Sequence, residues 1–91
     1  MIQTMPTREE AIALVKGALK KQRQRHPGFK SKIHVYEPSV RSKDDWWYVG
    51  VYPSSELKTI YYYYDILAQA EEELQDKKNL KILLIPVRPQ N

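Results

Sequence analysis

The pattern of hydrophobic and polar positions predicts a long helix near the start of the chain. Thr7 and Glu10 have the spacing of a capping box, so a helix is predicted to begin there. His26-Pro27-Gly28 ends it, because the residue before a proline avoids the helical region. The apolar positions between them follow a period of 3.6 and predict one buried stripe. They are Ala11, Ile12, Leu14, Val15, Ala18 and Leu19, together with Gln22.

Two segments with a period of two follow and predict strands. Residues 32–37 place Ile33 and Val35 on one face. Residues 46–52 separate Trp47, Val49 and Val51 from Trp46, Tyr48, Gly50 and Tyr52 on the opposite face. Residues 38–45 between the two strands are mostly polar and predict a loop or a long hairpin turn.

The stretch 59–64 is ambiguous, because it holds four consecutive tyrosines. Aromatic residues favour a strand, so an extra strand at 59–64 is one interpretation. A helical stripe that continues to the end of the segment favours a single helix over 59–78, which we prefer, with Asn79 as its C-cap. The stripe consists of Ile60, Tyr63, Tyr64, Leu67, Ala70 and Leu74.

The run 80–87 is the only near-continuous apolar segment, and it is short, branched and closed by Pro86. These features predict a buried strand around which the other elements are organised. A right-handed crossover would place it parallel to the second strand. If the crossover passes over the first strand, the sheet order is 2-1-3 and the last strand forms an edge, where Pro86 is tolerated.

The predicted fold is therefore α+β, with the order α-β-β-α-β and a three-stranded sheet that carries two helices on one face. The 91 residues suffice for one domain with one core. We expect residues 1–91 to form that single domain, with an N-terminal arm at 1–6 and a C-terminal tail at 88–91.

The net charge of +4 is unevenly distributed, because residues 11–36 hold seven cations and no acid. The later segment 65–76 is acidic. This asymmetry favours either a polyanionic partner for the basic half or two oppositely charged helices that lie side by side.

The residue types required for several kinds of chemistry are missing. The chain has no cysteine, no glycine-rich phosphate loop, and two histidines (His26 and His34) without ligand spacing. Asp44 and Asp45 are interpreted as turn residues rather than as acid-base catalysts. We expect no enzymatic activity, no cofactor and no metal site. No apolar run approaches about 18 residues and no signal peptide is evident, so we expect a cytoplasmic protein without membrane contact.

Two candidate surfaces remain, and they favour different partners. The candidate interaction surface is the open sheet face with His34, Tyr36, Trp46, Tyr48, Tyr52, Leu83 and Ile85. Because aliphatic side chains reach this face, we expect a protein-interaction module, most simply a homodimer or other homo-oligomer. The alternative is a single-stranded nucleic-acid (RNA) binding module that stacks bases on the aromatic face. Its candidate contacts are Lys16, Lys20, Arg23, Lys30, Lys32, Arg41 and Lys43.

Overall fold

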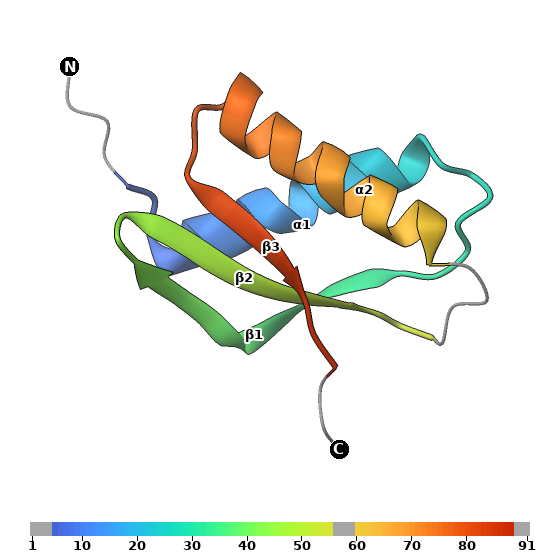
Figure 1. Ribbon diagram of the computed structural model, residues 1–91, viewed down its shortest axis with the longest axis horizontal. Helices are drawn as coiled ribbons and strands as arrows, with labels where there is room; N and C mark the ends of the chain where they lie inside the picture. The colour runs from blue at the N-terminus through green and yellow to red at the C-terminus, as the bar shows by residue number, and fades with distance from the viewer. Residues whose placement is uncertain (1–4, 56–59, 89–91) are drawn as a thin grey trace.

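The computed structural model describes residues 5–55 and 60–88, which form two helices, a π-helical turn and one three-stranded sheet (Figure 1). In chain order the elements are α1 (Arg8–Gln24), β1 (Ile33–Lys43), β2 (Trp46–Pro53), α2 (Tyr61–Glu72), the π-helical turn η1 (Glu73–Lys77) and β3 (Ile82–Pro86). The predicted α+β class and the order α-β-β-α-β are confirmed. The predicted arm and tail fall largely outside the described residues.

Helix α1 begins and ends as its sequence predicts. The Glu10 amide donates to the Thr7 hydroxyl (3.2 Å), and the Thr7 amide donates to the Glu10 carboxylate (2.9 Å), which completes the capping box. Arg25 forms the C-cap directly before His26 and Pro27. Of the predicted stripe, Leu14 is half-buried and the remaining residues are buried.

The first strand is longer than predicted, and the expected loop over 38–45 was wrong. Only Asp44 and Asp45 form the turn, both with positive φ (53° and 68°), as a two-residue hairpin requires. Residues 37–40 of β1 lie opposite the single residue Val49 of β2, which makes a large bulge. Pro38 is accommodated in this bulge, where the ladder is interrupted, so it does not end the strand.

The sheet order is β1-β2-β3, so the predicted order 2-1-3 was wrong. The prediction that the last strand runs parallel to the second is confirmed, with Val49 beside Leu84. The strand β2 is the central one, and its middle residues Val49, Gly50 and Val51 are all buried. The bulged β1 and the proline-terminated β3 occupy the two edges.

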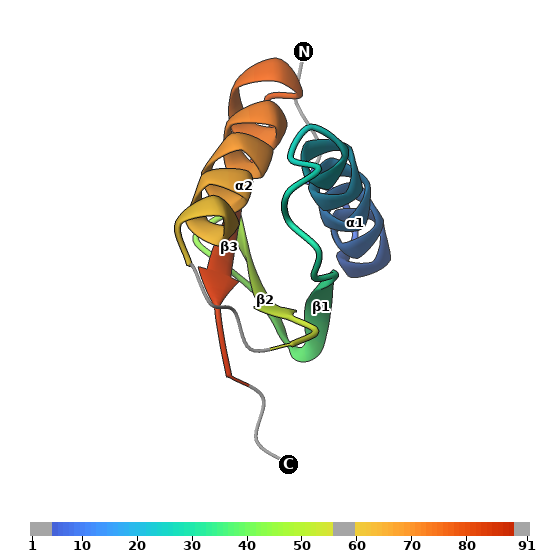
Figure 2. The same cartoon turned by 90° about the vertical axis from the view of Figure 1, so that its right-hand side faces the viewer.

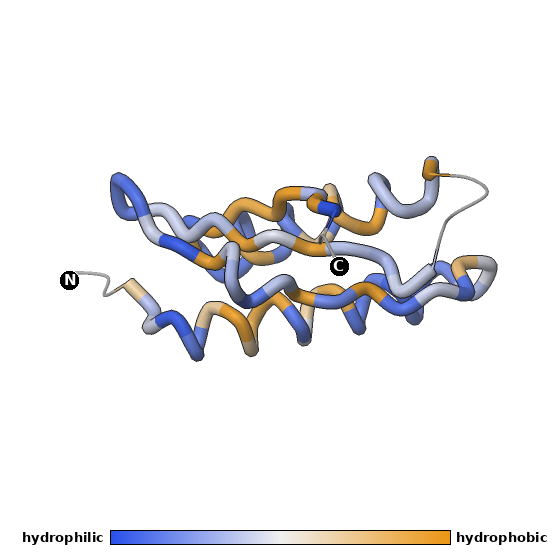
Figure 3. The backbone as a smooth tube through the Cα atoms, turned by 90° about the horizontal axis from the view of Figure 1, so that it is seen from below, coloured by the Kyte–Doolittle hydropathy of each residue, from blue (hydrophilic) through white to orange (hydrophobic). Residues whose placement is uncertain are grey.

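Both helices lie on the same face of the sheet, as predicted (Figure 2). Hydrophobic residues recur along α1, whereas the turn between β1 and β2 is hydrophilic (Figure 3). The core lies between the helices and the inner sheet face. Its largest fully buried side chains are Leu19, Ile66, Leu74, Ile82, Val15, Val49 and Val51.

The helical interpretation of the tyrosine stretch is correct, and the alternative strand at 59–64 is wrong for residues 61–64, which are helical. Thr59 lies outside the described residues. The predicted stripe was partly wrong, because Ile60 and Tyr64 are 56% and 50% exposed. Tyr63 is buried, together with Leu67, Ala70 and Leu74, and Ile66 replaces the two exposed residues. After η1, Asn79 adopts a positive φ of 56°, which terminates the helix near the predicted position.

Candidate interaction surfaces

The outer face, defined as the sheet face turned away from α1 and α2, carries four rows of side chains across the strands. From the turn end onward the rows are Lys43, Trp46 and Lys81; Arg41, Tyr48 and Leu83; Tyr36, Gly50 and Ile85; and His34, Tyr52 and Val87. All seven residues of the predicted interaction surface therefore share this face. Lys81 and Val87 were missed, although each has the same parity as Leu83 and Ile85.

Ring contacts link neighbouring strands on the outer face. The guanidinium of Arg41 lies over the Tyr48 ring, 5.9 Å from its centroid. The ring of Tyr52 contacts His34 (5.3 Å between centroids) and meets Tyr36 edge-on (6.2 Å). Cross-strand aromatic pairs of this kind stabilise a sheet and hold the rings in fixed positions. The outer face is thus an ordered aromatic surface.

The predicted nucleic-acid contacts are divided between two layers of the molecule. Lys16, Lys20 and Arg23 belong to α1, which lies behind the sheet, whereas Arg41 and Lys43 belong to the outer face. Lys30 and Lys32 are exposed in the connection between α1 and β1. The structure therefore does not bring the basic helix and the aromatic face together.

Two of the three predicted nucleic-acid contacts on α1 already have partners within the chain. Lys16 lies 4.0 Å from the Glu37 carboxylate, and Arg23 donates to the Ser31 carbonyl (3.1 Å). The sequence showed the charge run but not that Ser31 and Glu37, which follow the helix in the chain, fold back as partners of these two cations.

An exposed aromatic patch at the start of α2 was not foreseen. The patch consists of Ile60, Tyr61, Tyr62 and Tyr64, which are between 50% and 78% exposed. Beside it lies a groove of about 650 Å³ between the start of α2 and the ends of β2 and β3. The groove is lined by Tyr52, Pro53, Ser54, Ser55, Ile60, Tyr63, Tyr64, Pro86, Val87 and Arg88. Through Tyr52 and Val87, it joins the patch to the outer face.

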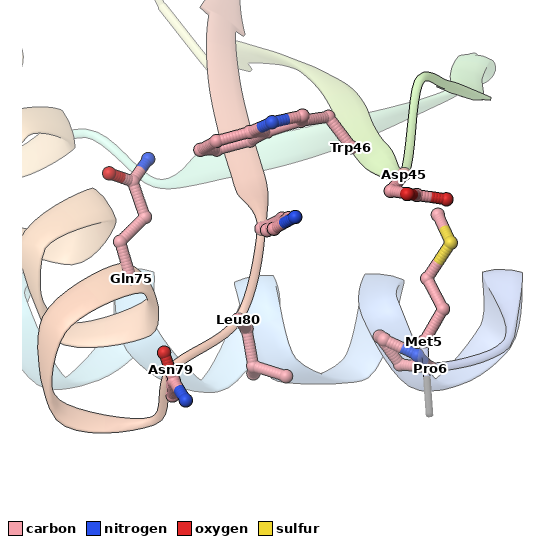
Figure 4. Close-up of a pocket in the computed structure, with 8 residues that line it drawn as sticks. Met5, Pro6, Asp45, Trp46, Gln75, Asn79 and Leu80 are labelled. Carbon is pink, nitrogen blue, oxygen red and sulfur yellow. The ribbon is translucent and has the colours of Figure 1, made fainter. Parts of the chain in front are cut away.

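A second pocket, of about 510 Å³, lies at the turn end of the sheet (Figure 4). It is lined by Met5, Pro6, Asp45, Trp46, Gln75, Asn79, Leu80 and Lys81. Figure 4 shows the Trp46 indole extending from β2 across β3 toward Gln75. The neighbouring Trp47 points to the inner face, where its Nε1 donates to the Pro6 carbonyl (2.9 Å).

The free edge of β3 is occupied by side chains from the end of α2 and from η1. The Leu84 amide donates to the Glu71 carboxylate (2.8 Å), and the Ile82 carbonyl accepts from the Gln75 side chain (2.8 Å). Pro86 has no amide proton to offer. An added strand would have to displace these bonds, so segment 82–85 is a blunted edge.

Lys21 of α1 and His26, which follows α1, contact acids of η1 and α2, which supports the interpretation of oppositely charged neighbours. Lys21 donates to the buried Glu73 carboxylate (2.6 Å), and this hydrogen bond lowers the pKa of Glu73. The two ring nitrogens of His26 lie 2.9 Å from the Gln22 carbonyl and 2.9 Å from the Asp65 carboxylate. Both acceptors favour the imidazolium, so the pKa of His26 is raised, chiefly by the Gln22 carbonyl.

Of the four tyrosines 61–64 at the start of α2, Tyr63 is the one whose side chain is buried. Its ring stacks on Phe29, and its hydroxyl donates to the Val51 carbonyl (3.3 Å). Burial raises the pKa of Tyr63 to about 12, so this hydroxyl stays protonated at neutral pH. Its arrangement is that of a core residue with a satisfied hydroxyl rather than a catalytic group.

Comparison with protein-family models, with curated proteins and with solved structures found no match to this chain. Within residues 5–55 and 60–88, no three His, Cys, Asp or Glu side chains are grouped so that they could hold a metal ion. Over the same ranges, no helix is long and apolar enough to cross a membrane. The surfaces themselves are therefore the basis for a functional proposal.

Proposed function

We propose that the protein is a non-catalytic interaction module that forms a homodimer through the aromatic patch and the adjoining groove. The observation that carries this proposal is the exposure of four large apolar residues at the start of α2. Tyrosines bury roughly 200 Å² each, so the three exposed ones alone offer roughly 350 Å². Adding Ile60 and the groove residues gives a patch at the upper end of what a typical monomer exposes.

The charge distribution favours a second copy as the occupant of this surface. The patch itself is uncharged, and of the described residues that line the groove only Arg88 carries a charge. A two-fold contact places the same patch on both subunits, so a neutral surface can meet itself without repulsion in a chain of net charge +4. Tyrosine is also enriched at the centres of protein interfaces.

A homodimer could also form by pairing the β3 edges of two sheets, but the blunted edge of β3 argues against this arrangement. Glu71 and Gln75 would have to leave their backbone partners before a second strand could pair there. Contact through the patch and groove requires no such change. We therefore assign the dimer contact to side chains and not to a continuous sheet.

Sedimentation equilibrium over a range of protein concentrations tests this assignment. We expect a dimer mass for the unmodified protein, and a monomer mass for the double variant Ile60→Lys, Tyr64→Lys, because charge placed in the contact is repelled by its symmetry mate. The matched control is Ala13→Lys, Gln24→Lys, which adds the same charge at exposed positions of α1. A monomer mass for the unmodified protein at about 100 µM would contradict the proposal.

A further inference from the structure

The cations of the outer face gather at one end of it, around Trp46. Lys43 of β1 pairs with Trp46, and Lys81 precedes β3 on the other side of the same residue. Neighbouring strands lie about 4.8 Å apart, so Trp46 stands midway between two lysines whose Cα atoms are roughly 10 Å apart. In the next row, Arg41 lies over the Tyr48 ring. We name these five residues the cationic-aromatic end.

No carboxylate occupies an outward position on any of the three strands. The outward residues of the other two rows are neutral or, in the case of His34, basic. The turn beside this end carries Asp44 and Asp45, and Asp45 lines the same pocket as Trp46 and Lys81. The three cations of the cationic-aromatic end outnumber these two acids, so the field over Trp46 and Tyr48 is positive and attracts an anionic ligand.

The alternation of flat rings and cations favours one kind of anion. Single-stranded nucleic acid offers unpaired bases that stack on aromatic rings and phosphates that contact cations at short intervals. A duplex keeps its base faces covered, and an acidic peptide uses the cations but has no planar groups for the rings. The pocket beside Trp46, with Leu80 and Pro6 on its walls, has a volume of about 510 Å³ and gives room for a base that passes the indole edge.

We propose that the cationic-aromatic end binds single-stranded nucleic acid, with bases stacked on Trp46 and Tyr48 and phosphates held by Lys43, Lys81 and Arg41. The site lies at the opposite end of the sheet from the groove of the proposed dimer and does not depend on that dimer. It also excludes most of the basic helix from direct contact, because Lys16 and Lys20 lie in the other layer of the fold.

The test is fluorescence anisotropy of a labelled oligothymidylate of about 12 nucleotides, titrated with the full chain at low salt. Lys43→Glu, Lys81→Glu should weaken binding by at least about tenfold and reduce the slope of affinity against salt by about two. The matched control is Lys20→Glu, Arg25→Glu, which makes the same charge change on α1 and its C-cap and should alter affinity by less than about twofold. Equal losses in both double variants would overturn the proposal.

Stacking is tested separately from charge. Trp46→Leu keeps an apolar side chain and every cation, and it should weaken binding by at least about fivefold. Binding should also quench the fluorescence of Trp46, whereas Trp47→Phe should leave that quenching intact. Each variant is first shown to melt cooperatively, so that loss of fold is not read as loss of binding. Unchanged affinity in Trp46→Leu, equal competition by polyglutamate, or no binding by the unmodified protein would each overturn the proposal.

Discussion

The hydroxyl of Ser39 lies directly over Gly50 on the outer face. It accepts a hydrogen bond from the Gly50 amide (3.0 Å) and donates one to the Tyr36 carbonyl (2.7 Å). A Cβ atom on residue 50 would come within 2.2 Å of the Ser39 oxygen and 3.1 Å of a Val87 methyl group. The absence of a side chain on Gly50 therefore allows the bulge of β1 to fold against β2.

We expect Gly50→Ala to destabilise the protein by about 1–3 kcal/mol, because the methyl group must displace Ser39 or the β3 end. Gly17→Ala is the matched substitution and should stabilise by up to about 1 kcal/mol, since nothing lies within 4 Å of its Cβ position in the exposed face of α1. Urea denaturation measures both. Equal effects of the two substitutions would show that the bulge adjusts freely.

Leu84 of β3 tests whether the last strand completes the core. It is 7% exposed and faces the helices, so Leu84→Ala should cost about 2–5 kcal/mol. Gln24→Ala, at an exposed position near the end of α1, should be nearly silent. The free energy of unfolding from denaturant titration is the measurement. The expectation that β3 is a buried strand that organises the fold is wrong, because β3 is an edge strand with Ile85 and Pro86 exposed. An unchanged value for Leu84→Ala would contradict the assignment of Leu84 to the core.

The contact of His26 with Gln22 and Asp65 predicts a pH dependence of stability. The folded pKa of His26 is raised above 6.5, so its contribution is fully present below pH 6.5 and is lost as pH rises through the folded pKa. Thermal unfolding between about pH 6 and pH 9 should show this fall. His26→Gln should abolish it.

Asp65→Asn refines the test of His26. It should reduce the pH dependence without abolishing it, because the Gln22 carbonyl is the larger cause of the raised pKa. A full loss of the dependence in Asp65→Asn would mean that the carboxylate alone controls the imidazole. His34→Gln is the control, and the fall between pH 6 and pH 9 assigned to His26 should remain in it.

The side chains that cover β3 predict a change in association. Glu71→Ala, Gln75→Ala removes the groups that bond Leu84 and Ile82 at the free edge. Exposed edges pair with other chains, so this variant should form larger particles by light scattering under conditions where the unmodified protein does not. Glu72→Ala, Asp76→Ala is the control with exposed acids on the same segment. Equal aggregation in both would assign the effect to charge and not to the edge.

Local features of the fold were predictable from the sequence, and the pairing of distant segments was less so. Thr7 and Glu10 are three residues apart, and their capping box depends on little beyond that spacing. The alternation of Val49 and Val51 with Gly50 gave the correct faces of β2. The sheet order was missed because the local pattern does not show whether β3 pairs with β1 or with the free edge of β2. The sequence signal for it was that residues 46–52 carry apolar or aromatic side chains at both parities, which is typical of a strand with neighbours on both sides.

For the interaction surfaces, too, local features were predictable and the placement of distant segments was not. Period two placed Trp46 and Tyr48 on one face, but it could not show that Lys81 stands beside them, because this requires the register of β3 against β2. The helical period put Ile60 and Tyr64 in a buried stripe. At the start of α2, however, Tyr63 is the residue that packs inward, against Phe29, and Ile60 and Tyr64 line a groove beside the ends of β2 and β3 instead.

The central place of β2 has a consequence for how the chain reaches its native state. One edge of β2 forms its backbone hydrogen bonds with β1, which is joined to it by a two-residue turn. The other edge pairs with β3, which follows the whole of α2 in the chain. Hairpins form in microseconds, and contacts between distant segments form more slowly. During that interval the second side of β2 is open to other molecules, so the yield of refolding should fall as protein concentration rises.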